Sequence, residues 1–243
     1  MGQKKAGAVC PGRRENCMRI IGIVPGAKLF GSEDLYADQY LFVNGYPKRI
    51  LANGGTPVGI LSSDGYAVED SLSLCDAFVF CGGARFYPYH FQVMEYAAKS
   101  GKPVLGICLG CQILLDRSEE HDTKTLGLVH GETLAFPAGL TQEDGSPAPV
   151  PHMGWNSLNV KKPDDPLFRG IPAEARFYFV HSYYVKPDPS LVLATTDYGM
   201  EFCSAYGGNG LWAVQFHPEK SGRFGLAILR NFYDYCKGAR DAR

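Results

Sequence analysis

The residues best suited to covalent chemistry are a cysteine between two glycines and a distant histidine followed by a glutamate. The cysteine lies in Gly106-Ile107-Cys108-Leu109-Gly110, after an apolar run of strand length and before a helical one. Small residues on both sides allow a sharp strand-to-helix turn with the thiol at its apex. The positive end of a helix dipole favours the thiolate there. This spacing predicts that Cys108 is a nucleophile.

The second element, His217 and Glu219, follows a predicted strand at 211–216. Residues two apart on an extended backbone point the same way, so Glu219 can lie beside the His217 imidazole and select its tautomer. A thiol, a base and an orienting carboxylate together make an activated nucleophile, and we expect these three residues to form a catalytic triad. Taken singly, Cys108 also fits a buried thiol in a tight turn and His217 a turn histidine.

The elements that must position these residues alternate between strands and helices in the first half of the chain. Predicted strands are Ile20–Val24, Val58–Leu61, Ala77–Cys81 and Val104–Ile107, with a helix near 91–99. This alternation predicts an α/β fold of three layers, with a mostly parallel sheet between helices and reactive residues beyond the strands' carboxyl ends. Gly82 and Gly83 close one such strand and Cys108 another. We expect backbone amides near Gly83 and Leu109 to hold the oxyanion of a tetrahedral intermediate.

The second half is rich in short strands, which predicts antiparallel hairpins added to the sheet. The expected strands are 133–136, 157–160, 176–184, 191–195, 202–206 and 211–216, followed by a helix at 224–235. The apolar run Gln112-Ile113-Leu114-Leu115 predicts that the helix begun after Cys108 continues through it.

Gly-Ile-Cys-Leu-Gly followed at a distance by Gln-Phe-His-Pro-Glu resembles the class I glutamine amidotransferase family. That resemblance implies a flavodoxin-like fold. It also implies a Cys-His-Glu triad, here Cys108, His217 and Glu219, that hydrolyses the side-chain amide of glutamine through a γ-glutamyl thioester.

Residues 103–233 resemble more narrowly the glutaminase subunit of imidazole glycerol phosphate synthase. The resemblance is carried by Gly127–Gly131, Pro151–Asn156, Tyr178–Tyr184 and Phe216–Gly222. It implies that Gln112, Ser182 and Tyr183 line the glutamine pocket, and that ammonia passes to a separate synthase subunit. We expect Trp155 to be packed in the structure, while the role of His152 stays open.

The N-terminal third instead resembles γ-glutamyl hydrolases of the γ-glutamyl-γ-aminobutyrate hydrolase type. The similar segments are Ile20–Ile23, Ala52–Val58 and Cys81–Gly83. They imply an alternative function, a free-standing hydrolase that acts on γ-glutamyl amines or peptides and needs no partner.

A third interpretation comes from Cys108-Leu109-Gly110-Cys111, which is a Cys-x-x-Cys at the start of a helix, as in dithiol redox proteins. Redox chemistry leaves the glycine-flanked turn and the distant His-x-Glu unexplained, and Cys111 fits a buried small residue. A zinc site needs a second close pair of ligands, which the spacing of the other cysteines and histidines does not offer. We expect neither a metal nor a cofactor.

Chain length, net charge and cysteine content limit the domain number, the kind of partner and the cellular compartment. The chain has 243 residues and a formal net charge of −1. We expect one domain at 20–240 after a flexible tail at 1–19 that lacks a signal peptide's apolar core. Balanced charge argues against nucleic acid or a membrane surface as a partner. A reactive thiol requires a reducing compartment, so we expect a cytoplasmic protein without disulfides.

Overall fold

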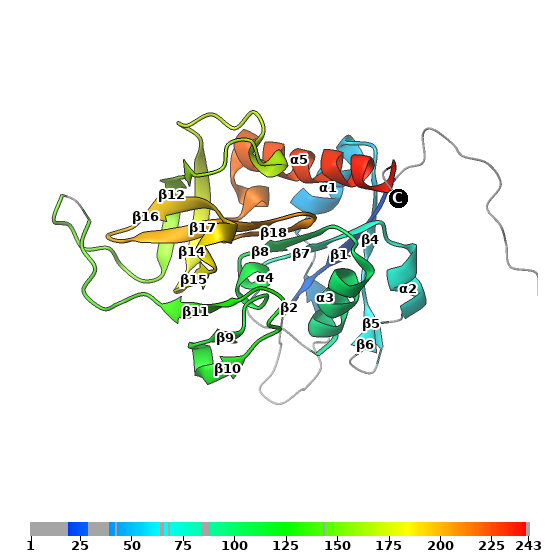
Figure 1. Ribbon diagram of the computed structural model, residues 1–243, viewed down its shortest axis with the longest axis horizontal. Coiled ribbons are helices and arrows are strands. Elements are labelled where there is room, and N and C mark those ends of the chain that lie inside the picture. The colour runs from blue at the N-terminus through cyan, green and yellow to red at the C-terminus, as the bar shows by residue number, and fades with distance from the viewer. Residues whose placement is uncertain are drawn as a thin grey trace, which may run out of the picture.

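The computed structural model describes residues 19–28, 39–41, 43–63, 66–67, 69–83, 88–142 and 144–241. Apart from Arg19, the predicted tail at 1–19 lies outside them. Among these residues a mixed sheet forms the middle layer (Figure 1). Helices α1 (Gly45–Ala52) and α5 (Gly222–Asp241) pack on one face, and α2 (Glu69–Leu74) and α3 (Pro88–Ser100) on the other. The predicted three-layer α/β fold is confirmed.

The parallel half of the sheet has the strand order β4-β1-β7-β8-β18. These strands are β4 (Thr56–Gly59), β1 (Ile20–Val24), β7 (Ala77–Phe80), β8 (Val104–Ile107) and β18 (Leu211–Val214). Side chains alternate between the faces, so Ile21 and Ile23 join the cluster under α1 and α5, whereas Val24 joins the cluster under α3. Three predicted strands match closely, and β4 begins two residues earlier than expected.

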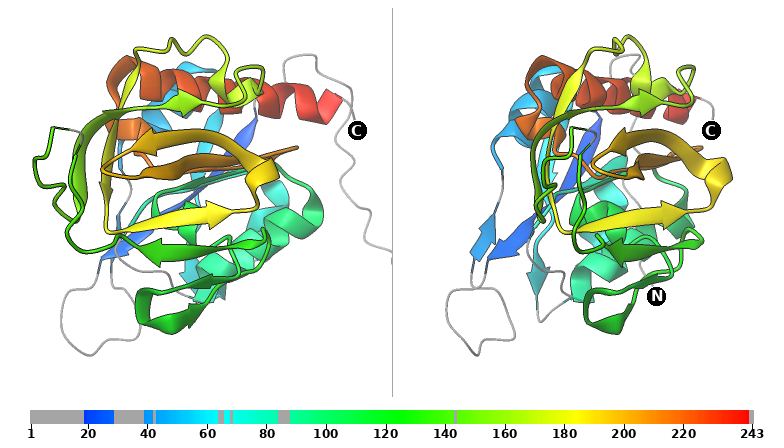
Figure 2. Two further views of the ribbon diagram at one scale, coloured as in Figure 1. Left: turned by 60° about the vertical axis from the view of Figure 1, so that its left-hand side comes forward. Right: turned by 90° about the vertical axis from the view of Figure 1, so that its left-hand side faces the viewer.

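The other, mostly antiparallel half continues the same sheet, and its yellow and green strands come to the front in Figure 2. From β18 outward it contains β17 (Glu201–Gly208), β15 (Tyr183–Pro187), β11 (Gly131–Ala135), β9 (Arg117–Ser118) and β10 (Thr123–Lys124), with β16 (Val192–Asp197) on β17 and β13 (Asn159–Val160) on β16. Because β18 is antiparallel to β17 and parallel to β8, it joins the two halves.

Smaller elements complete the described chain. Strands β12 (His152–Ser157) and β14 (Arg176–His181) form a separate two-stranded sheet. Two hairpins are β2 (Gly26–Lys28) with β3 (Gln39–Leu41) and β5 (Ser62–Ser63) with β6 (Tyr66–Ala67). Short 3-10 helices are η1 (Glu120–Asp122), η2 (Pro166–Phe168), η3 (Pro189–Leu191) and η4 (Pro218–Lys220).

Three predictions about individual elements are wrong. The expected strand 157–160 is divided at Leu158 between the end of β12 and β13. The helix after Cys108 does not continue to Leu115, because α4 spans only Leu109–Gln112. Carbonyls of the next residues accept hydrogen bonds from the segment 125–129 instead, which removes the partners of a longer helix. The expected strand 176–184 is also broken at Ser182, where the chain leaves the β12–β14 pair and joins the main sheet.

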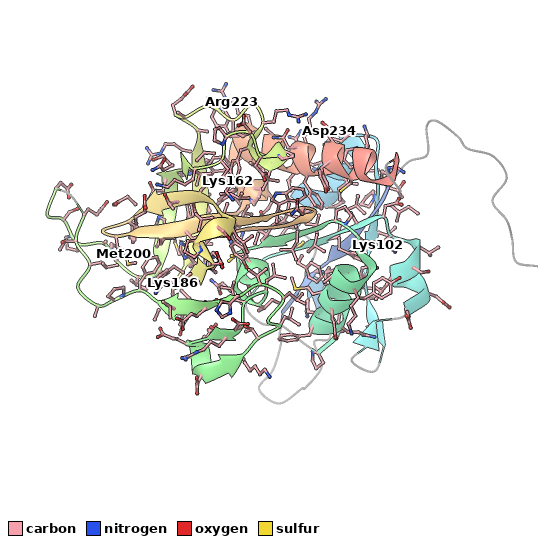
Figure 3. All side chains as sticks on the ribbon, in the orientation of Figure 1. Lys102, Lys162, Lys186, Met200, Arg223 and Asp234 are labelled. Atoms are coloured by element: carbon pink, nitrogen blue, oxygen red, sulfur yellow. The ribbon has the colours of Figure 1, made fainter. Side chains whose placement is uncertain are left out.

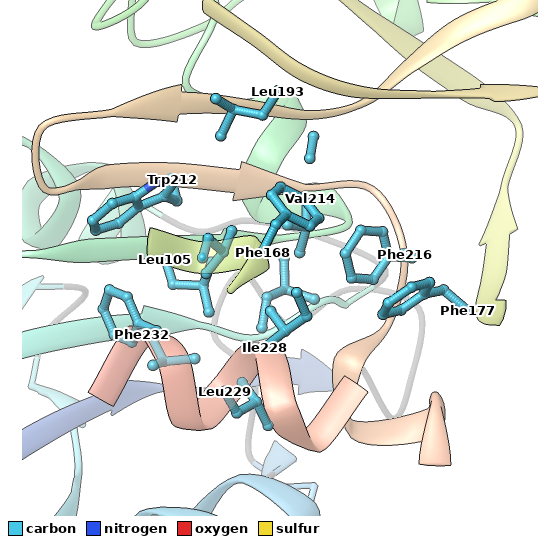
Figure 4. Close-up of a cluster of buried hydrophobic side chains, with 14 of the residues drawn as sticks. Leu105, Phe168, Phe177, Leu193, Trp212, Val214, Phe216, Ile228, Leu229 and Phe232 are labelled. Carbon is cyan, nitrogen blue, oxygen red and sulfur yellow. The ribbon is translucent and has the colours of Figure 1, made fainter. Parts of the chain in front are cut away.

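Helix α5 anchors the strands that precede the candidate site. Figure 4 shows Ile228, Leu229 and Phe232 of α5 packed toward Leu105 of β8 and the side chains of β18. All of these side chains are buried, and each contributes about 1.5–3 kcal/mol of transfer free energy. This packing holds β8 and β18 side by side under the residues that follow them.

Charged side chains are spread over different elements. Figure 3 labels Lys102 after α3, Lys162 after β13, Lys186 on β15, and Arg223 and Asp234 on α5. In the part of the chain that the structure describes, no helix is both long and apolar enough to cross a bilayer.

Candidate active site

Cys108 stands at a sharp turn between β8 and α4. Its backbone has φ 54° and ψ −109°, a conformation that costs a non-glycine residue about 1–3 kcal/mol. The flanking glycines make the turn possible, since a Cβ on Gly106 would lie 2.6 Å from the Gly110 carbonyl oxygen. The turn is held from the next strand, where the Val214 carbonyl accepts a hydrogen bond from the Cys108 amide at 2.8 Å. The strained turn that the spacing predicts is present.

His217 and Glu219 follow β18, the strand beside β8. The His217 Nδ1–H donates to Glu219 Oε1 at 2.8 Å, and the two side chains are only 8% and 2% exposed. Occupied Nδ1 leaves Nε2 as the nitrogen available to a neighbouring thiol. Burial lowers the pKa of His217, but contacts with Cys108 and Glu219 outweigh it and raise this pKa to about 9. The imidazole is therefore held as a cation near neutral pH.

Gly82 lies against both the Cys108 side chain and the His217 imidazole. A Cβ built on Gly82 would lie 2.8 Å from His217 Cε1 and 3.1 Å from Cys108 Cβ. Gly82 follows β7, so the carboxyl ends of β7, β8 and β18 meet at one edge of the sheet, as predicted. Any side chain at this position would push into the pair.

The other predicted site residues lie around this edge. Leu109 is half-buried at the start of α4, and Gly83 is exposed after β7. The buried Gln112 side chain donates from Nε2 to the Tyr183 carbonyl at 3.2 Å and to Gln215 Oε1 at 3.1 Å. Ser182 and Tyr183 are half-buried in the bend between β14 and β15. The Val180 carbonyl oxygen, just before that bend, lies 3.9 Å from Cys108 Sγ.

Three residues of the site were not predicted from sequence. The buried Tyr46 hydroxyl of α1 lies beside the Glu219 carboxylate, although no hydrogen bond of standard geometry joins them. Burial raises the pKa of Glu219, but His217 and then Tyr46 lower it, and the net shift is downward. Ser221 Oγ donates to the His217 carbonyl at 2.6 Å, and Gln215 binds Gln112. Ser221 and Gln215 lie within six residues of Glu219 in sequence, so their position next to the predicted pair could have indicated them. No sequence feature indicates Tyr46.

The two thiols of the Cys-x-x-Cys do not form a redox pair in the structure. Cys108 packs against the hydrophobic cluster under α5, whereas Cys111 is fully buried in the cluster under α3. Burial raises the pKa of the Cys111 thiol well above its usual value, and both thiols are free. Within the described ranges, His, Cys, Asp and Glu side chains form no group of three or more that could hold a metal ion.

The expectation that Trp155 is packed is wrong. Trp155 is 49% exposed and its neighbour Met153 is 61% exposed, both on the outer face of β12. Because strand side chains alternate, His152 and Asn156 point inward from the same strand. The outer face of the β12–β14 sheet is covered only in part, because the Lys220 ammonium of η4 lies over the Tyr178 ring while Met153 and Trp155 stay exposed.

A thiol at a strand-to-helix turn, beside an imidazole oriented by a carboxylate on a mostly parallel sheet, defines a class of α/β amide hydrolases with a cysteine nucleophile. The family model for "Glutamine amidotransferase class-I" matches residues 41–236. The chain belongs to this family, and it is accordingly a cysteine-dependent glutamine amidohydrolase.

Named relatives agree with this assignment. The chain is 62% identical over 151 residues to imidazole glycerol phosphate synthase subunit HisH of Nitratidesulfovibrio vulgaris, covering 62% of this chain and 71% of that protein. It is 40% identical over 216 residues to the same-named subunit of Desulfitobacterium hafniense, covering 88% and 93%. The second match extends beyond residues 103–233, the segment that carries the predicted resemblance.

Solved structures share the fold. PurLQS of Thermotoga maritima superposes with a TM-score of 0.60 at 18% identity, covering 90% of this chain and 99% of that one. A glutamine amidotransferase of the same organism gives a TM-score of 0.56 at 17% identity, covering 92% and 85%.

Proposed function

We propose that this chain is the glutaminase subunit of an imidazole glycerol phosphate synthase, releasing ammonia from glutamine for a separate synthase subunit. The relatives named above support this assignment. The observation that carries the chemistry is the cluster of Cys108, His217 and Glu219 at one edge of the sheet.

Catalysis begins with attack of the Cys108 thiolate on the γ-carbonyl carbon of glutamine. The carbonyl oxygen becomes an oxyanion that accepts hydrogen bonds from the backbone amides of Gly83 and Leu109, and loss of one such donor costs about 10²–10³ in rate. His217, charged near neutral pH, gives its Nε2 proton to the departing nitrogen. Ammonia leaves as the tetrahedral intermediate collapses to the γ-glutamyl thioester.

Hydrolysis of the thioester reverses these roles. Neutral His217 takes a proton from water, the hydroxide adds to the thioester carbonyl, and Cys108 leaves as thiolate with glutamate as product. Glu219 keeps Nδ1 protonated throughout. Gln112, Ser182 and Tyr183 bind the substrate around this centre.

The face of β12 that exposes Met153 and Trp155 is where the synthase subunit would dock. Exposed large apolar side chains on a soluble chain commonly mark interaction surfaces, and Met153 and Trp155 lie on one strand. This strand adjoins the site, because the Trp155 and Tyr178 rings are 6.0 Å apart and the Tyr178 carbonyl accepts from the His217 amide at 2.8 Å. Ammonia released near His217 would thus emerge close to the partner.

The test measures ammonia release from glutamine by the purified protein, without and with the cyclase subunit of an imidazole glycerol phosphate synthase from a related organism. We expect weak activity that rises with the partner, disappears in Cys108→Ala and survives in Cys111→Ala. The reverse dependence on the two cysteines would contradict the assignment. Trp155→Ala is expected to lose the rise with the partner while keeping the weak activity that the chain has by itself.

Residues 52–58 and 81–83 favour a second candidate, a free-standing γ-glutamyl hydrolase. The same assay separates the two functions when γ-glutamyl amines replace glutamine. Vigorous amine release without any partner would favour the hydrolase. We expect a cytoplasmic location for either function, because a reactive thiol needs a reducing compartment.

A further inference from the structure

The proposed mechanism leaves three buried histidines without a role, and two of them, His152 and His181, contact each other beside the site. We propose that His152 and His181 are positioning residues of the glutamine pocket, a pair of neutral imidazoles with fixed tautomers that hold the bend between β14 and β15. The proposal rests on the proposed glutaminase function for its kinetic test, and on the structure alone for the tautomers.

The tautomers follow from the hydrogen-bond partners. His181 Nδ1 lies 2.7 Å from the Tyr183 carbonyl oxygen, which can only accept, so this nitrogen carries the proton. The His181 Nε2 then has a lone pair, and His152 Nδ1, 3.0 Å away, must donate to it. His152 Nε2 is left as an acceptor that faces the Asn156 amide nitrogen at 3.5 Å. The order of donation runs from Asn156 through both rings to Tyr183.

Burial keeps both rings neutral. His152 is 2% exposed and His181 is 5% exposed. The His152 ring is stacked between Tyr198, with centroids 3.9 Å apart, and Phe179, at 4.8 Å. Burial lowers the pKa of His152 to about 4 and that of His181 to about 3. A proton added to either ring would also remove an acceptor and break the order of donation.

The bend that the pair holds is the bend that faces the thiol. The Tyr183 carbonyl accepts from His181 and also from the Gln112 side chain at 3.2 Å. Just before the bend, the Val180 carbonyl oxygen lies 3.9 Å from Cys108 Sγ. If His181 took the other tautomer, its Nδ1 lone pair would face the Tyr183 oxygen and repel it. The segment 180–183 and Gln112 would then shift together.

Simple packing is the competing explanation, because an aromatic cluster surrounds the pair. Two substitutions of His152 separate the explanations. His152→Asn keeps a nitrogen donor near the position of Nδ1 but loses most of the ring stacking. His152→Phe keeps an aromatic ring between Tyr198 and Phe179 but has no donor. Positioning predicts that Asn is the better replacement, and packing predicts that Phe is.

The experiment combines three measurements on the full chain and both variants. The ring ¹⁵N signals of labelled histidine report the tautomer of His181, steady-state kinetics give KM and kcat for glutamine, and iodoacetamide reports the reactivity of Cys108. We expect His152→Phe to raise KM about 3- to 10-fold, the loss of one hydrogen bond, and to shift the ¹⁵N signal of His181 Nε2, which loses its donor, while Nδ1 keeps its proton on the Tyr183 carbonyl. Alkylation of Cys108 is the control for loss of the site's structure and should change less than about twofold, since the Cys108 turn is held by its hydrogen bond to Val214 on β18.

We expect His152→Asn to retain the Nδ1–H signal and a KM within about twofold of the parent. An Nε2–H tautomer of His181 in the parent protein would overturn the proposal. So would His152→Phe with the parent's KM and an unshifted His181 Nε2 signal, or a larger KM in Asn than in Phe. If glutamine is not hydrolysed at all, the proposed function fails, while the tautomer measurements still decide on the histidine pair.

Discussion

Two histidines in this protein donate a hydrogen bond to an oxygen of the residue two positions further along the chain, but their pKa values shift in opposite directions. His217 Nδ1 donates to the carboxylate of Glu219 at 2.8 Å, and His181 Nδ1 donates to the backbone carbonyl of Tyr183 at 2.7 Å. Both rings are buried. The pKa of His217 is raised to about 9, whereas burial lowers that of His181 to about 3.

The difference shows what a buried imidazole needs in order to carry charge. A carbonyl dipole fixes the tautomer but does not offset the cost of burying a cation. A carboxylate with a neighbouring thiol does offset it. The His217 region is therefore suited to moving protons, and the His181 region to holding a backbone still.

The sharpest way to break this comparison is Glu219→Gln, which replaces the carboxylate by a neutral acceptor like the one at His181. We expect the pKa of His217 to fall well below 9 and kcat to fall on the order of 10³–10⁴-fold, as when the orienting acid of a related triad is neutralised. The pH profile of Cys108 alkylation measures the change in the ion pair. Activity close to that of the parent would mean that Glu219 has no part in charging the imidazole.

Tyr46→Phe tests a weaker contribution to the same contrast. The Tyr46 hydroxyl lowers the pKa of Glu219, so its removal should leave the buried carboxylate less well stabilised as the anion that His217 needs. We expect kcat to fall about 3- to 10-fold, the effect of one modest polar contact, with KM little changed. Tyr233→Phe is the matched control, since Tyr233 lines the same crevice between α1 and α5 away from Glu219. An equal loss in both variants would assign the effect to packing.

The features that could be predicted from the sequence are those set by residues close to one another along the chain. The turn at Cys108 and the His217–Glu219 pair are set by neighbours within two residues, and both are present. Tyr46 reaches Glu219 from 173 positions away in sequence, through the packing of α1 on α5, and no local pattern marks it.

The wrong predictions have the same origin. The apolar run at 112–115 fits a helix by itself, but its carbonyls find partners in the segment 125–129. Trp155 fits a packed residue by type, but β12 pairs only with β14, and about half of the Trp155 side chain, 49%, stays exposed on its outer face. In both cases tertiary partners overrode a local preference.

The smallest expected effect is on the pH dependence of the free energy of unfolding. This dependence has opposite signs for His217 and for the pair of His152 and His181. His217 has a folded pKa of about 9, above its usual 6.5, so its stabilisation is complete below pH 6.5 and is lost as pH rises toward 9. His152 and His181 have folded pKa values of about 4 and about 3, below the usual 6.5. Their contribution to the free energy of unfolding is therefore complete above pH 6.5 and is lost as the pH falls from 6.5 toward these folded values.

Urea unfolding at pH 5, 7 and 9 measures both slopes. Relative to the parent, His217→Gln should flatten the decline between pH 7 and 9, and His152→Asn should flatten the decline between pH 7 and 5. Each difference is expected to be on the order of 1 kcal/mol after allowance for partial solvent screening. The difference reports the substituted ring together with the groups coupled to it, which are Glu219 and Cys108 for His217 and His181 for His152. Slopes of the same sign in both variants would mean that the two buried environments do not differ in the way their hydrogen-bond partners indicate.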